Sequence, residues 1–364
     1  MHVLLKTAEI FYEKYERRIS SFALVAGFIF DSLTLQRIDL LFENLVILSY
    51  LIISGGSIIL LNYYQAYPLQ KSFLIRTQNF LPLFIQFAFG GLFSAFFIFY
   101  TRSATLASSW LFMFLLFFLL VGNEFFKGRY QRLTFQVSIY FVAIFSFSIF
   151  FVPMLLKTMG AAVFMLSGAV SLLVIYLFAQ ALFKVVPSHF LDQKINLRNS
   201  ILTIFILINI LYFLNLIPPI PLALKDASVY YSVERAGNSY RVVGEKKTWY
   251  ESLPFFTSET IHLGANAPLY VFSSVFAPTN LNTKIVHDWQ FFDNATGEWV
   301  SATRIIFSIK GGRDEGYRGF SRKEYLFPGE WRVDVKTERG QIIGRVRFDI
   351  TAESPGTVLE ERVL

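Results

Sequence analysis

Two histidines and an aspartate are the residues of this chain best suited to acid–base or metal chemistry. His287 and Asp288 are adjacent, and His262 lies upstream of them. Adjacent residues of a strand point to opposite faces, so His287 and Asp288 cannot easily form a catalytic pair, and no Ser or other His is spaced to complete a triad. Two histidines without a defined spacing are a weak metal signal. We therefore expect no catalytic residue, no metal and no cofactor, and we classify the chain as a non-enzyme.

Cysteine is absent from the chain. Its absence excludes disulfides, thiolate zinc sites, iron–sulfur clusters and a cysteine nucleophile together. His287 is in phase with Ile285, Trp289 and Phe291 along one face of a predicted strand, which places this histidine at the edge of an apolar core.

Aromatic and cationic side chains near the C-terminus predict a binding surface. Trp299 follows a turn, whereas the phase of Trp331 predicts a core position. Rings beside cations bind glycans or acidic protein surfaces through stacking and cation–π contacts. The predicted partner or ligand surface comprises Trp299, Tyr317, Arg318, Phe320, Arg322 and Lys323.

One acidic residue, Asp31, lies within an apolar segment and begins a polar series that includes Arg37. Charged residues inside a membrane are costly and usually functional. Two interpretations stay open for this membrane polar site. Asp31 either pairs with Arg37 at the outer headgroup level, or it marks a port for an ion or substrate on the outer face.

Two glycine pairs, Gly55/Gly56 and Gly90/Gly91, interrupt apolar segments. Paired glycines can mark the broken helices of a transporter. Close helix packing through small residues is the commoner cause of such pairs. A transporter or channel with a path near Asp31 and these glycine breaks is therefore kept as an alternative function.

Composition indicates an integral membrane protein. Of the 364 residues, 54% are hydrophobic and 16% charged, and the mean hydropathy is +0.49. The net charge is +7, but from Lys225 onward 18 basic and 18 acidic residues cancel, so the whole excess lies in the apolar half. Basic loops in that half set membrane orientation. The lipid bilayer is therefore an expected partner, and nucleic acid is not.

Seven apolar segments are predicted to cross the bilayer, each needing about 20 residues. The first, Ile19 to Leu35, is in doubt by hydropathy, and charge decides it. Seven spans place twelve Lys and Arg on the N-terminal side and three on the other, whereas six spans give no bias. The positive-inside rule then makes the N-terminus cytoplasmic and the C-terminal part extracytoplasmic. The other spans centre on Leu45 to Leu61, Phe80 to Tyr100, Thr105 to Phe126, Phe135 to Leu155, Ala161 to Phe183 and Ser200 to Ile217.

The predicted order of domains follows from these spans. Residues 1–18 form a cytoplasmic amphipathic segment at the interface, and residues 19–217 form the seven-helix transmembrane domain. A Pro-rich linker covers residues 218–226, because successive prolines deny helix continuation there. Residues 227–364 form the extracytoplasmic β-domain.

The hydrophobic period changes to two after about residue 226, which is typical of half-buried strands. If Arg339-Gly340 forms a hairpin turn, Trp331 lies opposite Phe348 on one face and Asp334 opposite Arg345 on the other. Six to eight short strands predict an immunoglobulin-like sandwich. The strands are expected at Leu269 to Phe276, Thr283 to Phe292, Val300 to Lys310 and Tyr317 to Tyr325, with weaker signals at Val229 to Val233 and Tyr240 to Val243.

Four short motifs carry a family resemblance. They are His287-Asp288-Trp289, the run from Tyr317 to Lys323, Pro328-Gly329-Glu330-Trp331-Arg332-Val333, and Gly340 to Phe348. With these motifs, the stretch from about Lys284 to Ile350 resembles a bacterial domain catalogued as domain of unknown function number 2914. The resemblance implies a bacterial origin and a small extracytoplasmic β-domain, and it supplies no catalytic residues.

The expected function is that of a non-enzymatic, multi-pass protein of the bacterial inner membrane. Its periplasmic β-sandwich is expected to bind another envelope component, as an accessory subunit of a membrane protein assembly. Besides the transporter, a second alternative is a glycan-binding sensor that uses Trp299 and Arg318.

Overall fold

The computed structural model describes residues 27–35, 40–67, 72–103, 106–125, 132–237, 239–246, 259–264, 267–313, 315–352 and 357–364. The predicted amphipathic segment 1–18, the start of the first predicted span and Arg37 lie outside these residues. The chain divides into two compact units: one contains the helices, and the other contains the strands, within Asn215–Leu364, together with Arg102–Ser109 and Leu156–Gly160.

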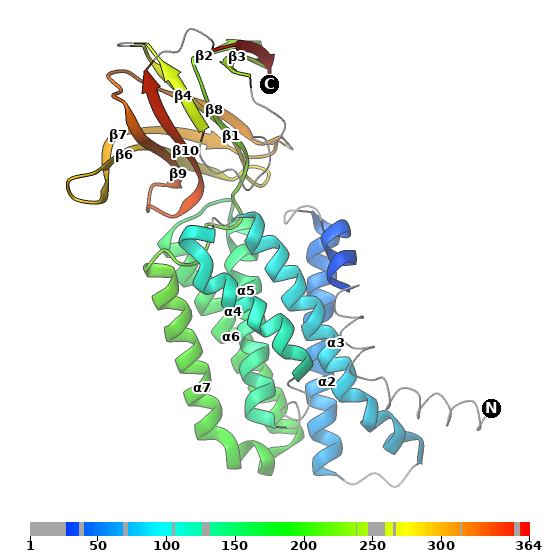
Figure 1. The fold of residues 1–364 in the computed structure, drawn as a ribbon. Coiled ribbons are helices and arrows are strands. Elements are labelled where there is room, and N and C mark those ends of the chain that lie inside the picture. The colour runs from blue at the N-terminus through cyan, green and yellow to red at the C-terminus, as the bar shows by residue number, and fades with distance from the viewer. Residues whose placement is uncertain are drawn as a thin grey trace. The chain divides into compact units, whose positions relative to one another are not determined.

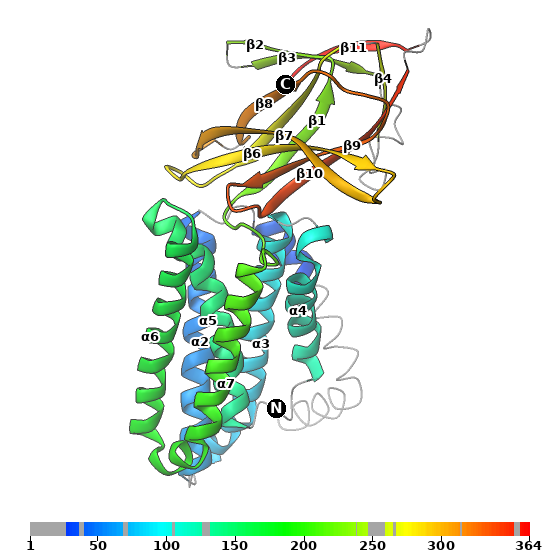
Figure 2. The ribbon, with the colours of Figure 1, turned by 90° about the vertical axis from the view of Figure 1, so that its left-hand side faces the viewer.

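The first unit consists of helices that run alongside one another (Figures 1 and 2). Residues 27–34 are helical. The longer helices are α2 (Leu41–Ala66), α3 (Ser72–Arg102), α4 (Leu106–Phe125), α5 (Leu133–Leu156), α6 (Ala161–Val185) and α7 (Pro187–Phe213).

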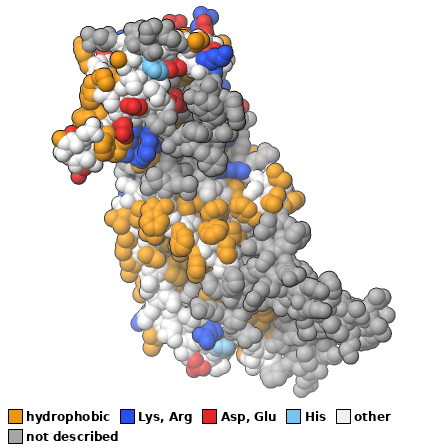
Figure 3. All heavy atoms as spheres, viewed as in Figure 1, with side chains coloured by type: hydrophobic (Ala, Val, Ile, Leu, Met, Phe, Trp, Pro, Cys, Tyr) orange, Lys and Arg blue, Asp and Glu red, His pale blue; other side chains and the backbone are white. Residues whose placement is uncertain are grey.

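Five of these helices are long and apolar enough to cross a membrane: α2, α5, α6, α7 and the part of α3 from Phe84 to Arg102. The apolar part of α4, Ser109–Asn123, is shorter. Exposed side chains on the viewed face of the helices are mainly hydrophobic (Figure 3), as expected of a surface in contact with lipid. Helix α7 begins at Pro187, well before the predicted Ser200, because proline suits the first turn of a helix and the polar residues after it continue the same helix.

Uncharged polar side chains form hydrogen bonds between neighbouring helices. Asn62 Nδ2 of α2 donates a hydrogen bond to Gln136 Oε1 of α5, at 2.6 Å. Asn123 Nδ2 of α4 donates to the backbone carbonyl of Gln86 in α3, at 2.8 Å. Such contacts between membrane helices contribute about 0.6 to 2 kcal/mol each.

The two glycine pairs do not break their helices, because α2 and α3 run through them without interruption. Instead, one member of each pair allows a close contact. An ideal Cβ on Gly55 would lie 2.6 Å from the Tyr140 hydroxyl, and one on Gly91 would lie 2.7 Å from the Tyr50 ring. Nothing lies within 4 Å of the corresponding position at Gly56. Close packing, rather than a broken helix, therefore explains Gly55 and Gly91.

The adjacent positions Gly55 and Gly56 allow a matched stability test. We expect Gly56→Ala to raise the unfolding temperature, because alanine favours a helix by up to about 1 kcal/mol over glycine. Gly55→Ala should instead destabilise the chain by about 1 kcal/mol, because Tyr140 must shift and weaken its 3.2 Å hydrogen bond to the Leu51 carbonyl. Thermal unfolding of both variants in detergent measures the difference; equal effects would contradict this account of the packing.

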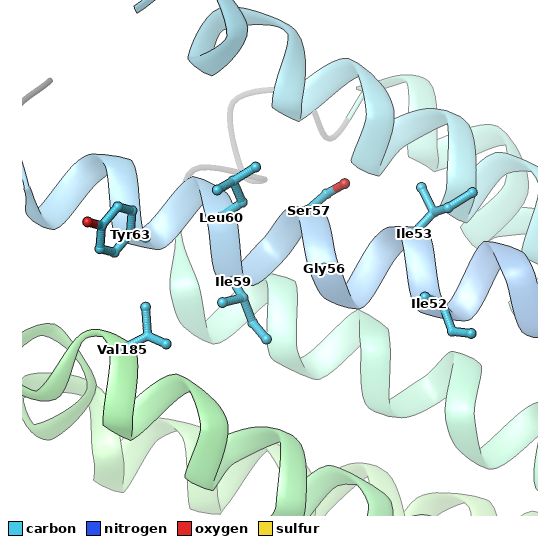
Figure 4. Close-up of a pocket in the computed structure, with 8 residues that line it drawn as sticks. All are labelled: Ile52, Ile53, Gly56, Ser57, Ile59, Leu60, Tyr63 and Val185. Atoms are coloured by element: carbon cyan, nitrogen blue, oxygen red, sulfur yellow. The ribbon is translucent and has the colours of Figure 1, made fainter. Parts of the chain in front are cut away.

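A shallow groove of about 700 Å³ lies along α2 (Figure 4). Gly56 lies near its middle, and Val185 of α6 lies close to Tyr63 at one end. Apart from the Ser57 and Tyr63 hydroxyls, the labelled lining side chains are apolar, so the groove suits hydrocarbon rather than a polar ligand. It is lined by Ile52, Ile53, Gly56, Ser57, Ile59, Leu60, Tyr63 and Val185.

The second unit contains three sheets. The first has the strand order β1-β5-β8, the second β4-β10-β9-β6-β7, and the third β11-β3-β2. The strands are β1 (Ala223–Tyr230), β2 (Ser232–Ala236), β3 (Ser239–Glu245), β4 (Glu259–Leu263), β5 (Leu269–Phe276), β6 (Asn282–Asp293), β7 (Glu298–Lys310), β8 (Tyr317–Lys323), β9 (Gly329–Thr337), β10 (Ile342–Ala352) and β11 (Leu359–Val363).

One apolar core contains residues of both the first and the second sheet. Val271 of β5 belongs to the same buried cluster as Trp289 of β6 and Trp331 of β9. Both tryptophans are almost completely buried, with exposed fractions of 0% and 1%. The predicted core position of Trp331 is therefore confirmed.

The predicted hairpin register of β9 and β10 is confirmed from Gly329 to Val335. Trp331 lies opposite Phe348, and Asp334 lies opposite Arg345. The register shifts by one residue nearer the turn, between Ile342 and Gly344. An ideal Cβ on Gly344 would lie only 1.9 Å from a Leu224 side-chain carbon. Glycine at this position therefore lets β1 approach β10 closely.

Three parts of the β-unit differ from the predictions. Strand β1 begins at Ala223, inside the expected linker 218–226. The weak strand signal at Val229 to Val233 covers the end of β1 and the start of β2. Strands β4 and β11 were not predicted, and β4 pairs with β10 in the parallel direction.

Candidate functional site

The outward side chains of β6, β7, β9 and β10 form the main polar cluster of the β-unit. In one row across these strands, Arg304, Asp288, Asp334 and Arg345 lie opposite one another. In the next row lie Ser301, Gln290, Arg332 and Arg347. We define the charged face as Asp288, Gln290, Trp299, Ser301, Arg304, Arg332, Asp334, Lys336, Arg345 and Arg347.

Asp288 lies at the centre of the charged face and is only 1% exposed. Its carboxylate accepts a hydrogen bond from Ser301 Oγ at 2.5 Å and one from Gln290 Nε2 at 2.7 Å, and it forms an ion pair with Lys336. Burial alone would raise the pKa of Asp288. The hydrogen bonds from Lys336, Ser301 and Gln290 outweigh burial and lower the pKa below its usual value.

Asp334 lies directly opposite Asp288 on the neighbouring strand and is 2% exposed. Arg345 Nε and Nη2 donate to its two carboxylate oxygens at 2.5 and 3.0 Å. This bidentate geometry is among the strongest that an ion pair can adopt. Each buried carboxylate thus has its own cation, and this pairing allows two like charges to lie on adjacent strands.

Arg332 connects the carboxylates to an aromatic side chain. Its Nε donates to Gln290 Oε1 at 2.8 Å, and its guanidinium carbon lies 4.3 Å from the centre of the Trp299 ring. Burial and the nearby Arg345 and Arg347 lower the pKa of Arg332 from its usual value. Arg332 is therefore held in one position by a hydrogen bond and a cation–π contact.

The two buried carboxylates of the charged face are poorly placed for acid–base catalysis. Both are already paired with cations and cannot readily accept a proton from a substrate. Among the residues that the structure describes, no group of three His, Cys, Asp or Glu is placed to hold a metal ion.

His287 lies on the opposite side of β6, completely buried in the core. Its two ring nitrogens lie 2.8 Å from Ser273 Oγ of β5 and 2.8 Å from Ser321 Oγ of β8. Ser321 Oγ also accepts the Trp289 Nε1 proton at 3.0 Å. The Ser321 hydroxyl then donates its own proton to His287 Nδ1, which accepts, and His287 Nε2 donates to Ser273 Oγ.

These hydrogen bonds fit the neutral form of the His287 ring, which has one donor and one acceptor nitrogen. Burial lowers the pKa of His287 to about 4, so the ring carries no charge near neutrality. His287 and Asp288 lie on opposite faces of their strand, as their adjacency predicts.

The structure does not bring the predicted surface residues onto one surface. Trp299 lies on the charged face, beside Arg332, whereas the other five residues lie on β8, in a different sheet. On β8, Tyr317 packs against the core, and Lys323 Nζ donates to Thr303 Oγ1 of β7 at 2.8 Å.

The remaining β8 residues point the other way. Phe320, 38% exposed, lies 6.0 Å from the Tyr270 ring, and Arg322 lies above the same ring at 5.9 Å. The Arg318 backbone carbonyl accepts a hydrogen bond from the Tyr240 hydroxyl at 3.3 Å. Successive side chains of a strand point to opposite faces, so consecutive residues of β8 are divided between two faces.

The predicted membrane polar site is described only in part. Asp31 lies in the helical segment 27–34 and is partly buried. Its predicted partner, Arg37, lies outside the described residues.

The predicted hairpin register placed Asp334 opposite Arg345 on one face but did not identify that face as a site. The signal was their cross-strand register, which put opposite charges in contact. The burial of Asp288 could not be predicted from its place in the sequence. It depends on Lys336 of the neighbouring strand β9, which lies diagonally across from Asp288 and forms an ion pair with it.

A protein-family model described as "Protein of unknown function (DUF2914)" matches residues 282–350. This match confirms the resemblance of the C-terminal region. It covers β6 to β9 and most of β10, and therefore the whole charged face. No curated protein matches the chain in sequence.

Similarities to solved structures are slight. A β-glucosidase from Listeria innocua in complex with gluconolactone matches 32% of this chain with a TM-score of 0.19 and 13% identity. The match spans 17% of the β-glucosidase chain. An alkylpurine DNA glycosylase from Pseudomonas fluorescens, bound to DNA containing an abasic site analogue, matches 83% of this chain and 99% of its own, with a TM-score of 0.19 and 12% identity.

Proposed function

We propose that this chain is a non-enzymatic membrane protein whose β-domain binds another component of the bacterial envelope through the charged face. The helices anchor the chain, with seven spans and a cytoplasmic N-terminus, so the β-domain is periplasmic. The shared core of the first two sheets supports an immunoglobulin-like sandwich for this domain. The partner is a protein of the same assembly.

The near-complete burial of Asp288 and Asp334 beneath cationic side chains carries the proposal. Charges on an ordinary solvated sheet face remain exposed and mobile, whereas these carboxylates are 1% and 2% exposed. Burying ion pairs seldom stabilises a fold relative to apolar residues. A charge array that is ordered before contact loses little side-chain entropy on binding, and such an array gives specificity.

Arg347 offers a direct test of the charged face. It is exposed, and within the described residues it forms no ion pair, so its reversal leaves both buried carboxylates paired. We expect Arg347→Glu to reduce affinity capture of the partner from native membranes at least tenfold, as measured by quantitative mass spectrometry.

Arg241→Glu is the matched control, because Arg241 belongs to β3 and its exposed pair with Glu361 contributes little. The amount of partner captured by Arg241→Glu should remain within about twofold of that captured by wild type. A chain truncated after Pro221 should insert in the membrane but capture nothing. Equal capture by wild type, Arg347→Glu and the truncated chain would contradict the proposal.

A further inference from the structure

A pocket of about 490 Å³ lies at the edge of the second sheet, where β6 begins and β7 ends. Strand β6 contributes residues 282–284 and β7 contributes residues 308–310, which lie opposite one another in the ladder. Tyr317 of β8 and Met159 also line it. We call this the edge pocket. Its size is in the range of sites that hold small molecules or headgroups.

The polar side of the edge pocket carries a net positive charge. Lys284 and Lys310 line it, together with one carboxylate, that of Glu338. Lys284 Nζ pairs with Glu338 at 2.9 Å, and both side chains are about half exposed. Lys310 is exposed and forms no ion pair with a described residue. One ammonium group is therefore available to an anionic ligand.

The two lysines lie on either side of Ser308. Ser308 is directly opposite Lys284, and it precedes Lys310 by two residues, so all three side chains leave the same face of the sheet. The apolar lining residues belong to the core instead: Ile309 is buried, and Met159 packs against the same cluster. This combination suits a ligand in which an anionic group is joined to hydrocarbon.

Chain connectivity places the edge pocket at the membrane surface. Met159 lies in the segment Leu156–Gly160, which belongs to the β-unit and joins α5 directly to α6. Both helices are long and apolar enough to cross a membrane. Because consecutive Cα atoms are about 3.8 Å apart, the Cα of Met159 lies within roughly 11 Å of the end of α5 and roughly 8 Å of the start of α6. The headgroup region on each side of a bilayer is about 5 to 8 Å thick, so Met159 lies within it or next to it.

From these observations we propose that the edge pocket binds the headgroup of an anionic phospholipid, with Lys310 Nζ donating to a phosphate oxygen. Lysine binds phosphate through charge-assisted hydrogen bonds, and basic pockets beside membrane helices bind acidic headgroups. A soluble phosphate would contact the polar side alone, whereas a phospholipid also covers the apolar residues near Met159. The inference rests on the membrane anchoring in the proposed function, and it assigns a ligand to residues outside the charged face.

Native mass spectrometry of the full chain in detergent, with phosphatidylglycerol as the probe, measures this binding. We expect wild type to retain one molecule of this lipid, and Lys310→Gln to bind it about tenfold more weakly, because a charge-assisted contact is lost. Lys157→Gln is the matched control. Lys157 is exposed and lies two residues from Met159 but does not line the pocket, so this variant should bind within about twofold of wild type.

Ser308→Phe tests the pocket without changing its charge. The added ring would occupy the space between the two lysines, so phosphatidylglycerol should bind at least tenfold more weakly than it does to wild type. Ser308 is exposed on the edge strand, and the variant should therefore unfold at the same temperature as wild type.

Equal weakening by Lys310→Gln and Lys157→Gln would overturn the proposal, because it would show a general attraction between the basic surface and the lipid. Wild-type binding by Ser308→Phe, or no lipid retained by wild type, would overturn it too. Displacement of the lipid by an equal concentration of glycerol phosphate would assign the pocket to a soluble phosphate instead.

The lipid measurement and the capture of a protein partner fail separately. A chain that retains phosphatidylglycerol but captures no protein would keep the edge pocket and refute the role of the charged face. A chain that captures its partner through Arg347 but retains no lipid would do the reverse.

Discussion

Replacing Asp334 by alanine is expected to destabilise the β-domain by about 3 kcal/mol. The substitution leaves the Arg345 guanidinium, whose side chain is 15% exposed, without its bidentate partner. Removing one member of a buried ion pair typically costs about 3 to 5 kcal/mol. Relief of repulsion from Asp288, directly opposite, recovers only about 0.2 to 1 kcal/mol, so the loss of the ion pair dominates.

Urea unfolding of the full chain in detergent, followed by tryptophan fluorescence, measures this effect because Trp289 and Trp331 are buried in the β-domain. Glu338→Ala is the matched control. It removes an ion pair with Lys284 in which both side chains are about half exposed, and such pairs contribute about 0 to 1 kcal/mol.

Replacing both Asp334 and Arg345 by leucine distinguishes the loss of an ion pair from the loss of packing. If an unpaired buried charge causes the instability, the double variant should recover most of the lost stability. A double variant as unstable as Asp334→Ala would show that packing, rather than charge, is the cause.

The second large effect is a dependence of stability on pH that originates at His287. The pKa of this residue is about 4 in the folded chain, against an ordinary value of 6.5. Below pH 6.5 the unfolded chain binds a proton that the folded chain does not. The stabilisation is therefore fully present above pH 6.5, is lost progressively as the pH falls to about 4, and amounts to about 3 kcal/mol over this range.

Substitution of His287 by glutamine isolates this contribution. Glutamine does not titrate, so the free energy of unfolding of His287→Gln should fall less steeply between pH 6.5 and 4 than that of wild type. Carboxylates titrate in both proteins, so their contributions to the pH dependence cancel when the two profiles are compared. Identical slopes in the two pH profiles would contradict the role assigned to the buried ring.

Much of the architecture could be predicted from local patterns. The helices follow from long apolar segments, and β5 was predicted with its observed bounds because its residues lie between clear turn signals. The register of β9 and β10 followed from one proposed turn. The short strands β4 and β11 were missed because their pairing partners lie far away in sequence, and five residues carry little periodicity.

The candidate site was less predictable than the fold. Trp299 was identified, but its contact with Arg332 depends on pairing among three strands. The β8 residues were grouped because they are consecutive, although consecutive strand residues point to opposite faces. Strand β8 was predicted to reach Tyr325 but ends at Lys323, because Tyr325 adopts a left-handed backbone conformation that no sequence signal indicates.

The row Arg304, Asp288, Asp334 and Arg345 has the electrostatic form of a linear quadrupole. Its charges follow the order plus, minus, minus, plus over four neighbouring strands that are about 4.8 Å apart. The four charges therefore sum to zero. The potential of a quadrupole falls more steeply with distance than that of a single charge, and salt screens what remains beyond a Debye length of about 8 Å. This row therefore contributes little to the diffusional encounter with the proposed partner. At contact, however, a displacement by one strand spacing brings like charges together, so the row discriminates alignment rather than accelerating association.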